Sequence, residues 1–259
     1  MFPLLLLAGA AQAGEAPKVD WIWQVNLGRC SLRQQVDDRR LVEIAFTPAN
    51  SSPTVTIYDR RAKKPSDGNL EGGSLAFTGG MAVNADIWIS SDPSVGKGIA
   101  ASTKDRDMLA RFARASSVEI SHPKFGTVKA PVRSAAAAVD ALAECEKRKL
   151  SEWEIDADAL HSLKSLPVPS KAFYKIFSTL DFPTDAAAYG VEGGVIARLG
   201  IGTDGKVETC KSLNPIPYKG FEESVCNVLR TKGKFEPAIG SDGNPISAPY
   251  VLSVRFVGS

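Results

Sequence analysis

Short segments in which apolar and polar residues alternate follow one another through the first half of the chain. Alternation at every second position is typical of strands that bury one face, and these segments are rich in β-branched and aromatic residues. They are residues 21–27, 41–46, 54–58, 85–89, 118–120 and 126–129. Residues 105–113, which follow a cap near Thr103, and residues 132–148, with apolar residues at helical spacing, predict two helices. The first part of the chain is therefore predicted to be β-rich with two helices.

The alternation is clearest toward the C-terminus. Residues 191–201 predict a strand, Asp204-Gly205 is typical of a tight hairpin turn, and residues 207–211 predict the returning strand. A helix is expected from about Tyr218 to Thr231, because its apolar residues recur at every fourth position.

A second turn signal, Asp242-Gly243, precedes a last predicted strand that runs from Ile246 to Val257. Because side chains alternate between the two faces of a strand, its apolar residues share one face. These residues are Ile246, Ala248, Tyr250, Leu252, Val254 and Phe256. The predicted C-terminal order is β-β-α-β.

The two parts of the chain meet at a segment with linker composition. Residues 163–170 contain two prolines and two serines, which favour a linker or a strap that crosses between domains. We therefore expect an α+β protein. Residues 14–160 would form a β-rich N-terminal domain of unknown role, residues 161–171 a linker, and residues 172–259 a smaller C-terminal domain.

The bulk composition fits a globular protein without a strongly charged partner. A chain of 259 residues with 44% hydrophobic residues can bury one large core or two ordinary ones. Its formal net charge of +2 is too small to indicate binding to nucleic acid or to an anionic membrane surface.

The N-terminus has the pattern of a signal peptide. A short apolar run begins at Leu4, and Ala11-Gln12-Ala13 is the small-x-small pattern that signal peptidase cleaves, although no Lys or Arg precedes the run. We expect residues 1–13 to be removed by cleavage near Ala13. The run is far shorter than the roughly 20 residues of a membrane-spanning helix, so no integral membrane anchor is expected.

Four cysteines, Cys30, Cys145, Cys210 and Cys226, are an even number, which in an exported chain indicates two disulfides. Three pairings are possible. We favour Cys30 with Cys145 and Cys210 with Cys226, because each bridge then stays inside one expected domain. A metal site is the weaker alternative, since the sequence has no C-x-x-C pair. We expect no metal and no cofactor.

The sequence carries no convincing catalytic motif. Residues 200–205 match G-x-G-x-x-G, but a strand and not a helix is expected after them, so a hairpin turn is favoured over a nucleotide site. The hydrolase motif G-x-S-x-G does not occur. The two histidines, His122 and His161, have no partner that the sequence reveals. We therefore expect that the protein is not an enzyme.

Five C-terminal segments, in this order, resemble the TonB C-terminal domain. They are Asp181-Phe182-Pro183, residues 191–195, Asp204-Gly205, residues 235–238 and residues 243–246. The resemblance covers roughly the last third of the chain. Within it, Cys210 and Cys226 are similar to the cysteine pair carried by one branch of these domains, which joins the second strand to the helix.

This resemblance implies a periplasmic domain that contacts outer-membrane transporters by adding a peptide of the partner as a strand beside its edge strand. The last strand would take that role, and Pro249 within it favours an edge position. The candidate partner-binding residues are Ile246, Tyr250, Leu252, Val254 and Phe256. The alternative is that this strand only completes the core.

The chain departs from an energy transducer of this family, which has a membrane-spanning N-terminal helix and a long Pro-rich linker. We therefore expect a soluble periplasmic TonB-family protein that binds a peptide or protein of the outer-membrane transport system, such as a TonB-dependent receptor. The alternative is a structural or scaffold protein of the envelope with no transport role.

Overall fold

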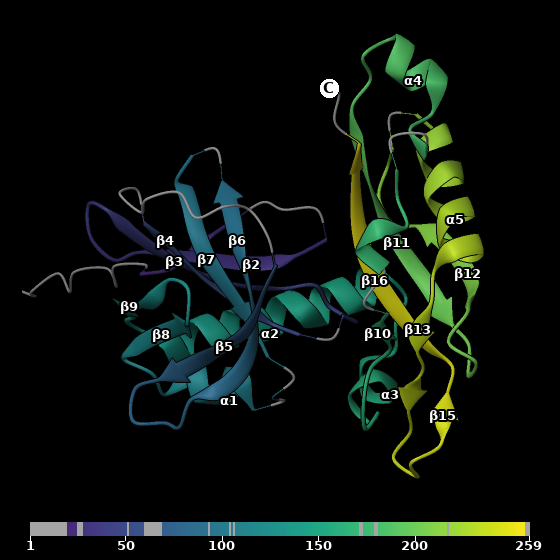
Figure 1. Ribbon diagram of the computed structural model, residues 1–259. Helices are drawn as coiled ribbons and strands as arrows, with labels where there is room; N and C mark the ends of the chain where they lie inside the picture. The colour runs from purple at the N-terminus through teal and green to yellow at the C-terminus, as the bar shows by residue number, and fades with distance from the viewer. Residues whose placement is uncertain are drawn as a thin grey trace, which may run out of the picture.

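The computed structural model describes ten stretches of the chain. They are residues 20–24, 28–50, 52–59, 69–92, 94–103, 105, 107–170, 173–178, 181–216 and 218–256. The predicted signal peptide and its cleavage point lie outside the described residues. The fold is α+β, as predicted, with a β-rich N-terminal unit followed by a smaller β/α/β unit (Figure 1).

An antiparallel sheet that contains nine of the described strands forms the N-terminal unit, in the order β1-β2-β3-β4-β7-β6-β5-β8-β9. The strands are β1 (Ile22–Trp23), β2 (Cys30–Gln35), β3 (Arg40–Phe46), β4 (Thr54–Asp59), β5 (Asn69–Phe77), β6 (Val83–Asp92), β7 (Gly96–Ser102), β8 (Ser117–His122) and β9 (Gly126–Pro131). Three helices follow or interrupt it: α1 (Met108–Ala113), α2 (Ala135–Glu152) and α3 (Ala157–His161).

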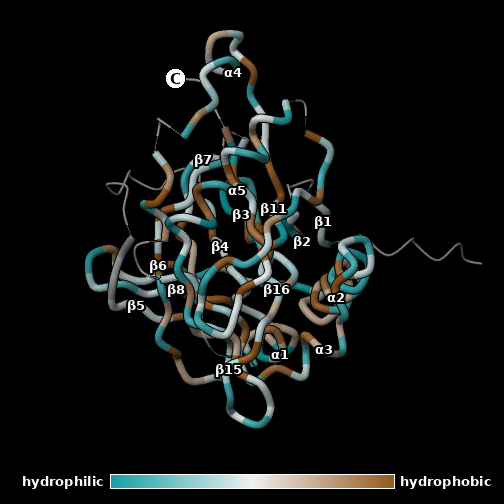
Figure 2. Tube along the Cα trace, turned by 90° about the vertical axis from the view of Figure 1, so that its right-hand side faces the viewer, coloured by the Kyte–Doolittle hydropathy of each residue, from teal (hydrophilic) through white to brown (hydrophobic). Residues whose placement is uncertain are grey.

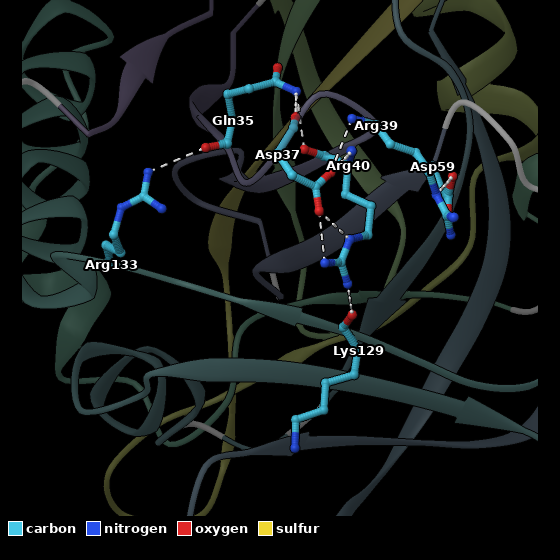
Figure 3. A network of polar contacts seen from close by, with 7 residues as sticks. All are labelled: Gln35, Asp37, Arg39, Arg40, Asp59, Lys129 and Arg133. Atoms are coloured by element: carbon cyan, nitrogen blue, oxygen red, sulfur yellow. Dashed lines mark hydrogen bonds and ion pairs between the residues drawn. The ribbon is translucent and has the colours of Figure 1, made fainter.

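The N-terminal sheet curls until its first strands meet its last strand. The buried Gln34 side chain of β2 donates to the Arg133 carbonyl and accepts from the Arg133 amide, both at 2.9 Å. Arg40, at the start of β3, donates to the carbonyl of Lys129 in β9 at 2.8 Å (Figure 3). These polar contacts between the two ends of the sheet enclose the core.

Helix α2 completes that core and is covalently fixed to the sheet. Leu142 and, on α1, Phe112 are fully buried. Cys145 of α2 forms a disulfide with Cys30 of β2, with a Cα–Cα distance of 6.0 Å. The same pairing is the one favoured by the sequence.

A three-stranded antiparallel sheet in the order β12-β11-β16 is the centre of the C-terminal unit, and α5 packs against β11 and β12. These elements are β11 (Gly193–Ile201), β12 (Val207–Ser212), α5 (Gly220–Lys232) and β16 (Ala248–Phe256). The remaining elements are short: β10 (Val168–Pro169), η1 (Phe173–Lys175), α4 (Thr184–Ala188), β13 (Phe235–Glu236), β14 (Ala238–Ile239) and β15 (Pro245–Ile246). A second disulfide, Cys210–Cys226, joins β12 to α5 with a Cα–Cα distance of 5.6 Å.

The segment expected to be a linker is hydrogen-bonded to the C-terminal unit. Val168 and Pro169 form β10, which pairs with β13. The amide of Lys164 donates to the carbonyl of Ile239 at 2.8 Å, and Ser165 forms a bridge with the same residue. These bonds hold the segment as a strap along the C-terminal unit.

The two units share an apolar cluster, which we call the interface cluster. Its buried members are Ala49, Leu150, Trp153, Ile155, Leu160, Leu163, Ile196, Ala238, Ala248 and Val251. Helix α2 runs from the N-terminal sheet to this cluster (Figure 1). In Figure 2 the apolar stretches gather in the interior of the molecule, whereas the hairpin tip beside β15 is hydrophilic. One face of the C-terminal sheet packs under α5, and the N-terminal unit covers the part of the other face that contains Ile196 and Val251.

A turn between β3 and β4 brings the N-terminal unit against β16. In this turn Asn50 donates its backbone amide to the carbonyl of Thr47 at 3.0 Å, and Ala49 has a φ of 58°. A left-handed backbone costs a non-glycine residue roughly 1–2 kcal/mol. Ala49 is 2% exposed within the interface cluster, so its burial offsets part of this strain.

Two hydrogen bonds connect this turn to Val251 of β16. The Val251 amide donates to the Ala49 carbonyl at 3.3 Å, and the Asn50 side-chain amide donates to the Val251 carbonyl at 3.1 Å. Elsewhere in the interface Arg198 of β11 donates to the Trp153 carbonyl at 2.9 Å. The units are thus joined by directed polar contacts as well as by apolar packing.

No helix among the described residues is both long enough and apolar enough to cross a membrane.

Removal of each disulfide should destabilise the protein according to the length of the loop that it closes. The loops span 115 and 16 residues, so replacing Cys30 and Cys145 by Ala should cost about 5 kcal/mol and replacing Cys210 and Cys226 about 3 kcal/mol. Urea unfolding monitored by circular dichroism measures both losses. A larger loss for the Cys210–Cys226 pair would contradict this interpretation.

The contact between Asn50 and Val251 should contribute measurably to stability. Asn50→Ala leaves the Val251 carbonyl without this donor, so the free energy of unfolding should fall by about 1 kcal/mol. Amide hydrogen exchange at Val251 should become faster, because the turn is held less firmly. Asn84→Ala, at an exposed position in β6, is the matched control. Unchanged exchange at Val251 in the Asn50 variant would show that the turn does not depend on this bond.

Candidate functional site

Strand β16 is an edge strand of the C-terminal sheet. Among the described strands it pairs only with β11, in a register that runs from Gly193 opposite Phe256 to Ile201 opposite Ala248. Pro249 lies inside β16, opposite Gly200. A proline, which lacks an N–H, is tolerated in a strand where its nitrogen points away from the neighbouring strand.

The register shows which backbone groups of β16 point to the open side. Hydrogen-bonded and non-hydrogen-bonded pairs alternate in an antiparallel ladder. Because the backbone groups of Val251 bond to the turn of the N-terminal unit, those of Tyr250, Leu252 and Val254 bond to β11. By the same alternation, the backbone groups of Ser253 and Arg255 point away from β11.

Four of the five predicted binding residues have side chains that pack toward α5. Tyr250 and Phe256 are 4% and 6% exposed, and Leu252 and Val254 are partly buried against the same core. Phe256 stacks on Phe221 of α5 with ring centroids 4.5 Å apart. These side chains therefore help to build the core. A partner at this strand would contact mainly the backbone and the parts of these side chains that remain exposed.

The fifth residue, Ile246, does not belong to this strand. It lies in β15, pairs with Ala238 of β14 and is 44% exposed. The turn at Asp242-Gly243 closes a separate small hairpin, and the chain leaves that hairpin at Ser247 before β16 begins. The alternation in the sequence continues across two different sheets, which is why the last strand was predicted two residues too long at its start.

The Asp-Phe-Pro segment that carries part of the family resemblance has a structural role here. Asp181 accepts the Ser178 amide at 2.6 Å, and this backbone hydrogen bond is the main reason why the pKa of its carboxyl is lowered. Phe182 contacts Phe221 and Phe256 edge-on, with centroids 5.9 and 5.3 Å away. The segment therefore holds the residues that directly precede α4 against the core between β16 and α5.

A pocket of about 420 Å³ lies beside β16, between the two units. Its described lining residues are Arg29, Thr47, Asn50, Phe173, Phe177, Tyr250, Leu252, Ser253, Val254 and Arg255. Five of these residues are apolar or aromatic, and two, Arg29 and Arg255, carry guanidinium groups. No acidic residue is among the described lining residues.

Sequence reasoning did not identify the N-terminal side of this pocket. Arg29 directly precedes β2, and Thr47 and Asn50 frame the turn that contacts Val251. Gly28, beside Arg29, has a φ of +67°, and a Cβ there would lie 3.0 Å from Ile196. A turn signal was present at Pro48, but nothing in the sequence indicates which distant strand such a turn contacts.

The histidines lie apart from this pocket. His122 is 5% exposed at the end of β8, and its Nδ1 accepts the Lys124 amide at 3.1 Å. His161 faces Glu146 at 3.5 Å on the surface. Within the described ranges no three His, Cys, Asp or Glu side chains are grouped as metal ligands would be. Neither histidine is among the described lining residues of the pocket beside β16.

Comparison with known proteins supports the C-terminal resemblance. The family model of the Gram-negative bacterial TonB protein C-terminal matches residues 178–257, which include α4, α5 and all three strands of the C-terminal sheet. No curated protein matches the chain. Residues 178–257, the C-terminal part of the chain, therefore form a domain that matches the TonB C-terminal family.

Proposed function

We propose that this protein is a periplasmic binding protein of the TonB family that takes up a peptide segment of an outer-membrane transport protein as an added strand beside β16. The observation that supports this proposal most directly is the position of β16 at an edge of a TonB C-terminal domain, with a pocket next to it. Such binding needs no catalytic residue and no cofactor.

The N-terminal unit restricts where a strand could be added. Pro249 has no N–H to offer, and both backbone groups of Val251 already bond to the turn at residues 47–50. An added strand would therefore lie at the end of β16, where the backbone groups of Arg255 point away from β11 beside the pocket. Strand addition draws its affinity from backbone hydrogen bonds and its selectivity from side-chain pockets. At this end of β16 the backbone groups that point away from β11 lie close to the pocket.

The proposed location follows from the cysteines and the family. Two disulfides suit an oxidising compartment, and the matched domain is one of Gram-negative bacteria. Export by the predicted signal peptide, with cleavage near Ala13, would place the mature chain in the periplasm, where it could reach a TonB-dependent receptor.

The contacts at Val251 favour a second candidate function, that of an envelope scaffold. They make β16 part of an internal interface in which Ala49 and Val251 share one apolar cluster. A scaffold would use the C-terminal sheet to hold the N-terminal unit in place and would bind no transporter peptide. The two functions differ in whether the outer side of β16 accepts a partner.

Arg255→Pro separates these two functions, because it removes an amide that points away from β11 and leaves the ladder with β11 intact. We expect the wild type and the control Arg255→Ala to capture a TonB-dependent receptor from an outer-membrane extract, and Arg255→Pro to lose at least about tenfold of this capture. Mass spectrometry identifies the captured protein, and circular dichroism verifies the fold of each variant. Equal capture by Arg255→Pro would refute strand addition, and no capture by the wild type would favour the scaffold.

A further inference from the structure

Strand β12 is the edge of the C-terminal sheet opposite β16, and among the described strands it pairs only with β11. The Leu213 amide, directly after β12, donates to the Ile196 carbonyl of β11 at 2.8 Å. Because backbone groups alternate in direction along an antiparallel strand, those of Ser212 and Cys210 point away from β11. Without a cover, these outward groups would leave a second edge of the sheet open for pairing.

Helix α5 covers this edge with one of its faces. Glu222, Cys226 and Arg230 follow one another at every fourth position, so they form one stripe along the helix. Glu222 accepts the Ser212 amide at 2.8 Å. Arg230 donates to the Cys210 carbonyl at 3.3 Å, and Cys226 forms the disulfide with Cys210. We call these five residues the edge clamp, since each residue of the stripe is bonded to β12.

The neighbouring face of α5 holds the helix in the core. Phe221, Val225 and Leu229, each one residue before a member of the stripe, are fully buried. They lie in the same apolar cluster as Leu199 of β11, and α5 packs against the C-terminal sheet (Figure 1). This packing involves neither cysteine of the edge clamp. Loss of the disulfide would therefore loosen the cover over β12 while the helix stays in its place.

The disulfide of the edge clamp is the more accessible of the two. Thiol–disulfide exchange begins when a thiolate reaches one of the two sulfurs, so it depends on exposure. Cys30 and Cys145 are 0% and 4% exposed, whereas Cys210 is half-buried at the surface of the sheet. Its partner Cys226 is 6% exposed. An incoming thiolate would therefore attack Cys210, and Cys226 would be the leaving group.

The two disulfides also differ in what their loss costs the fold. The Cys210–Cys226 loop spans 16 residues, and the Cys30–Cys145 loop spans 115 residues. In the chain-entropy picture the shorter loop contributes less to stability. A disulfide that stabilises the fold less is reduced more easily, because the stability that is lost opposes reduction. Access and energetics therefore favour reduction of the same disulfide.

We propose that Cys210–Cys226 is a reducible bond, which a dithiol oxidoreductase breaks to uncover the β12 edge. A thiolate of the reductant attacks Sγ of Cys210, the S–S bond breaks, and Cys226 leaves as a thiolate that is then protonated. The second thiol of the reductant attacks the mixed disulfide and releases Cys210 as a thiol. Two electrons and two protons thus pass to the protein, and the reductant becomes a disulfide. Arg230 lies one turn after Cys226 on the same face of α5, and a guanidinium there favours the thiolate.

This reaction is independent of a partner at β16, because β12 and β16 lie on opposite sides of β11. Failure of strand addition at β16 would leave the edge clamp untouched. Conversely, a disulfide that resists reduction would not affect the capture of a receptor.

Reduction of the folded wild type by dithiothreitol tests the selectivity. Samples are blocked with N-ethylmaleimide at a series of times, and peptide mass spectrometry reports the labelling of each cysteine. We expect Cys210 and Cys226 to be labelled at least about tenfold faster than Cys30 and Cys145. In urea, where the difference in access is lost, this ratio should fall below about threefold. Reduction of both disulfides at equal rates in the folded protein would overturn the proposal.

The attacked sulfur is identified by trapping the mixed disulfide. A thioredoxin-type oxidoreductase whose resolving cysteine is replaced by serine cannot complete the reaction and stays bound to the cysteine that it attacked. We expect this bond at Cys210, because Cys226 is buried. A bond at Cys226, or no trapped complex, would contradict the proposed reaction.

Hydrogen exchange, measured by NMR with and without dithiothreitol, tests whether the edge opens. After reduction the Ser212 amide, which faces α5, should exchange at least about tenfold faster. The Leu213 amide, which is bonded to β11, is the control within the same segment and should change less than about threefold. The variant with Cys210→Ser and Cys226→Ser should show this pattern without reductant, and circular dichroism verifies its fold. An unchanged Ser212 amide, or equal changes at both amides, would refute the edge clamp.

Discussion

The arrangement of the molecule depends on the apolar contact between the end of α2 and the face of the C-terminal sheet opposite α5. Trp153 and Leu150, at the end of the helix, are buried together with Ile196 of β11 and Val251 of β16. Because the same helix is bonded to β2 through Cys145, it fixes the position of the C-terminal sheet relative to the N-terminal core. Every feature of the candidate site, including the pocket and the covered part of β16, follows from this placement.

Much of the fold could be predicted from alternation and turn chemistry, and the exceptions have physical causes. Strands β5 and β7 were not predicted because they contain Gly-Gly, Gly-Lys-Gly and Ser, which read as turns. Their glycines are needed for close packing: a Cβ on Gly73 would lie 2.0 Å from the Ile87 side chain, and one on Gly98 would lie 2.7 Å from the Tyr58 ring. Glycine here marks a large neighbour across the sheet, which a single segment of sequence cannot reveal.

The candidate site was predictable only in its local part. Tyr250, Leu252, Val254 and Phe256 share a face of one strand, as their spacing predicts, because that pattern depends on the strand alone. Arg29 lines the pocket only because two units, whose pocket residues lie more than a hundred residues apart in the sequence, pack together. Spacing within a segment carries no information on such a contact, so the composite nature of the pocket emerges only from the structure.

The covered middle of β16 also affects how the protein behaves when it is crowded. An exposed, regular edge strand is a template on which chains can polymerise into aggregates, and natural proteins protect such edges with prolines or with covering loops. β16 has both protections next to each other, Pro249 and the turn that bonds to Val251. The turn therefore shortens the part of β16 on which a second chain could pair.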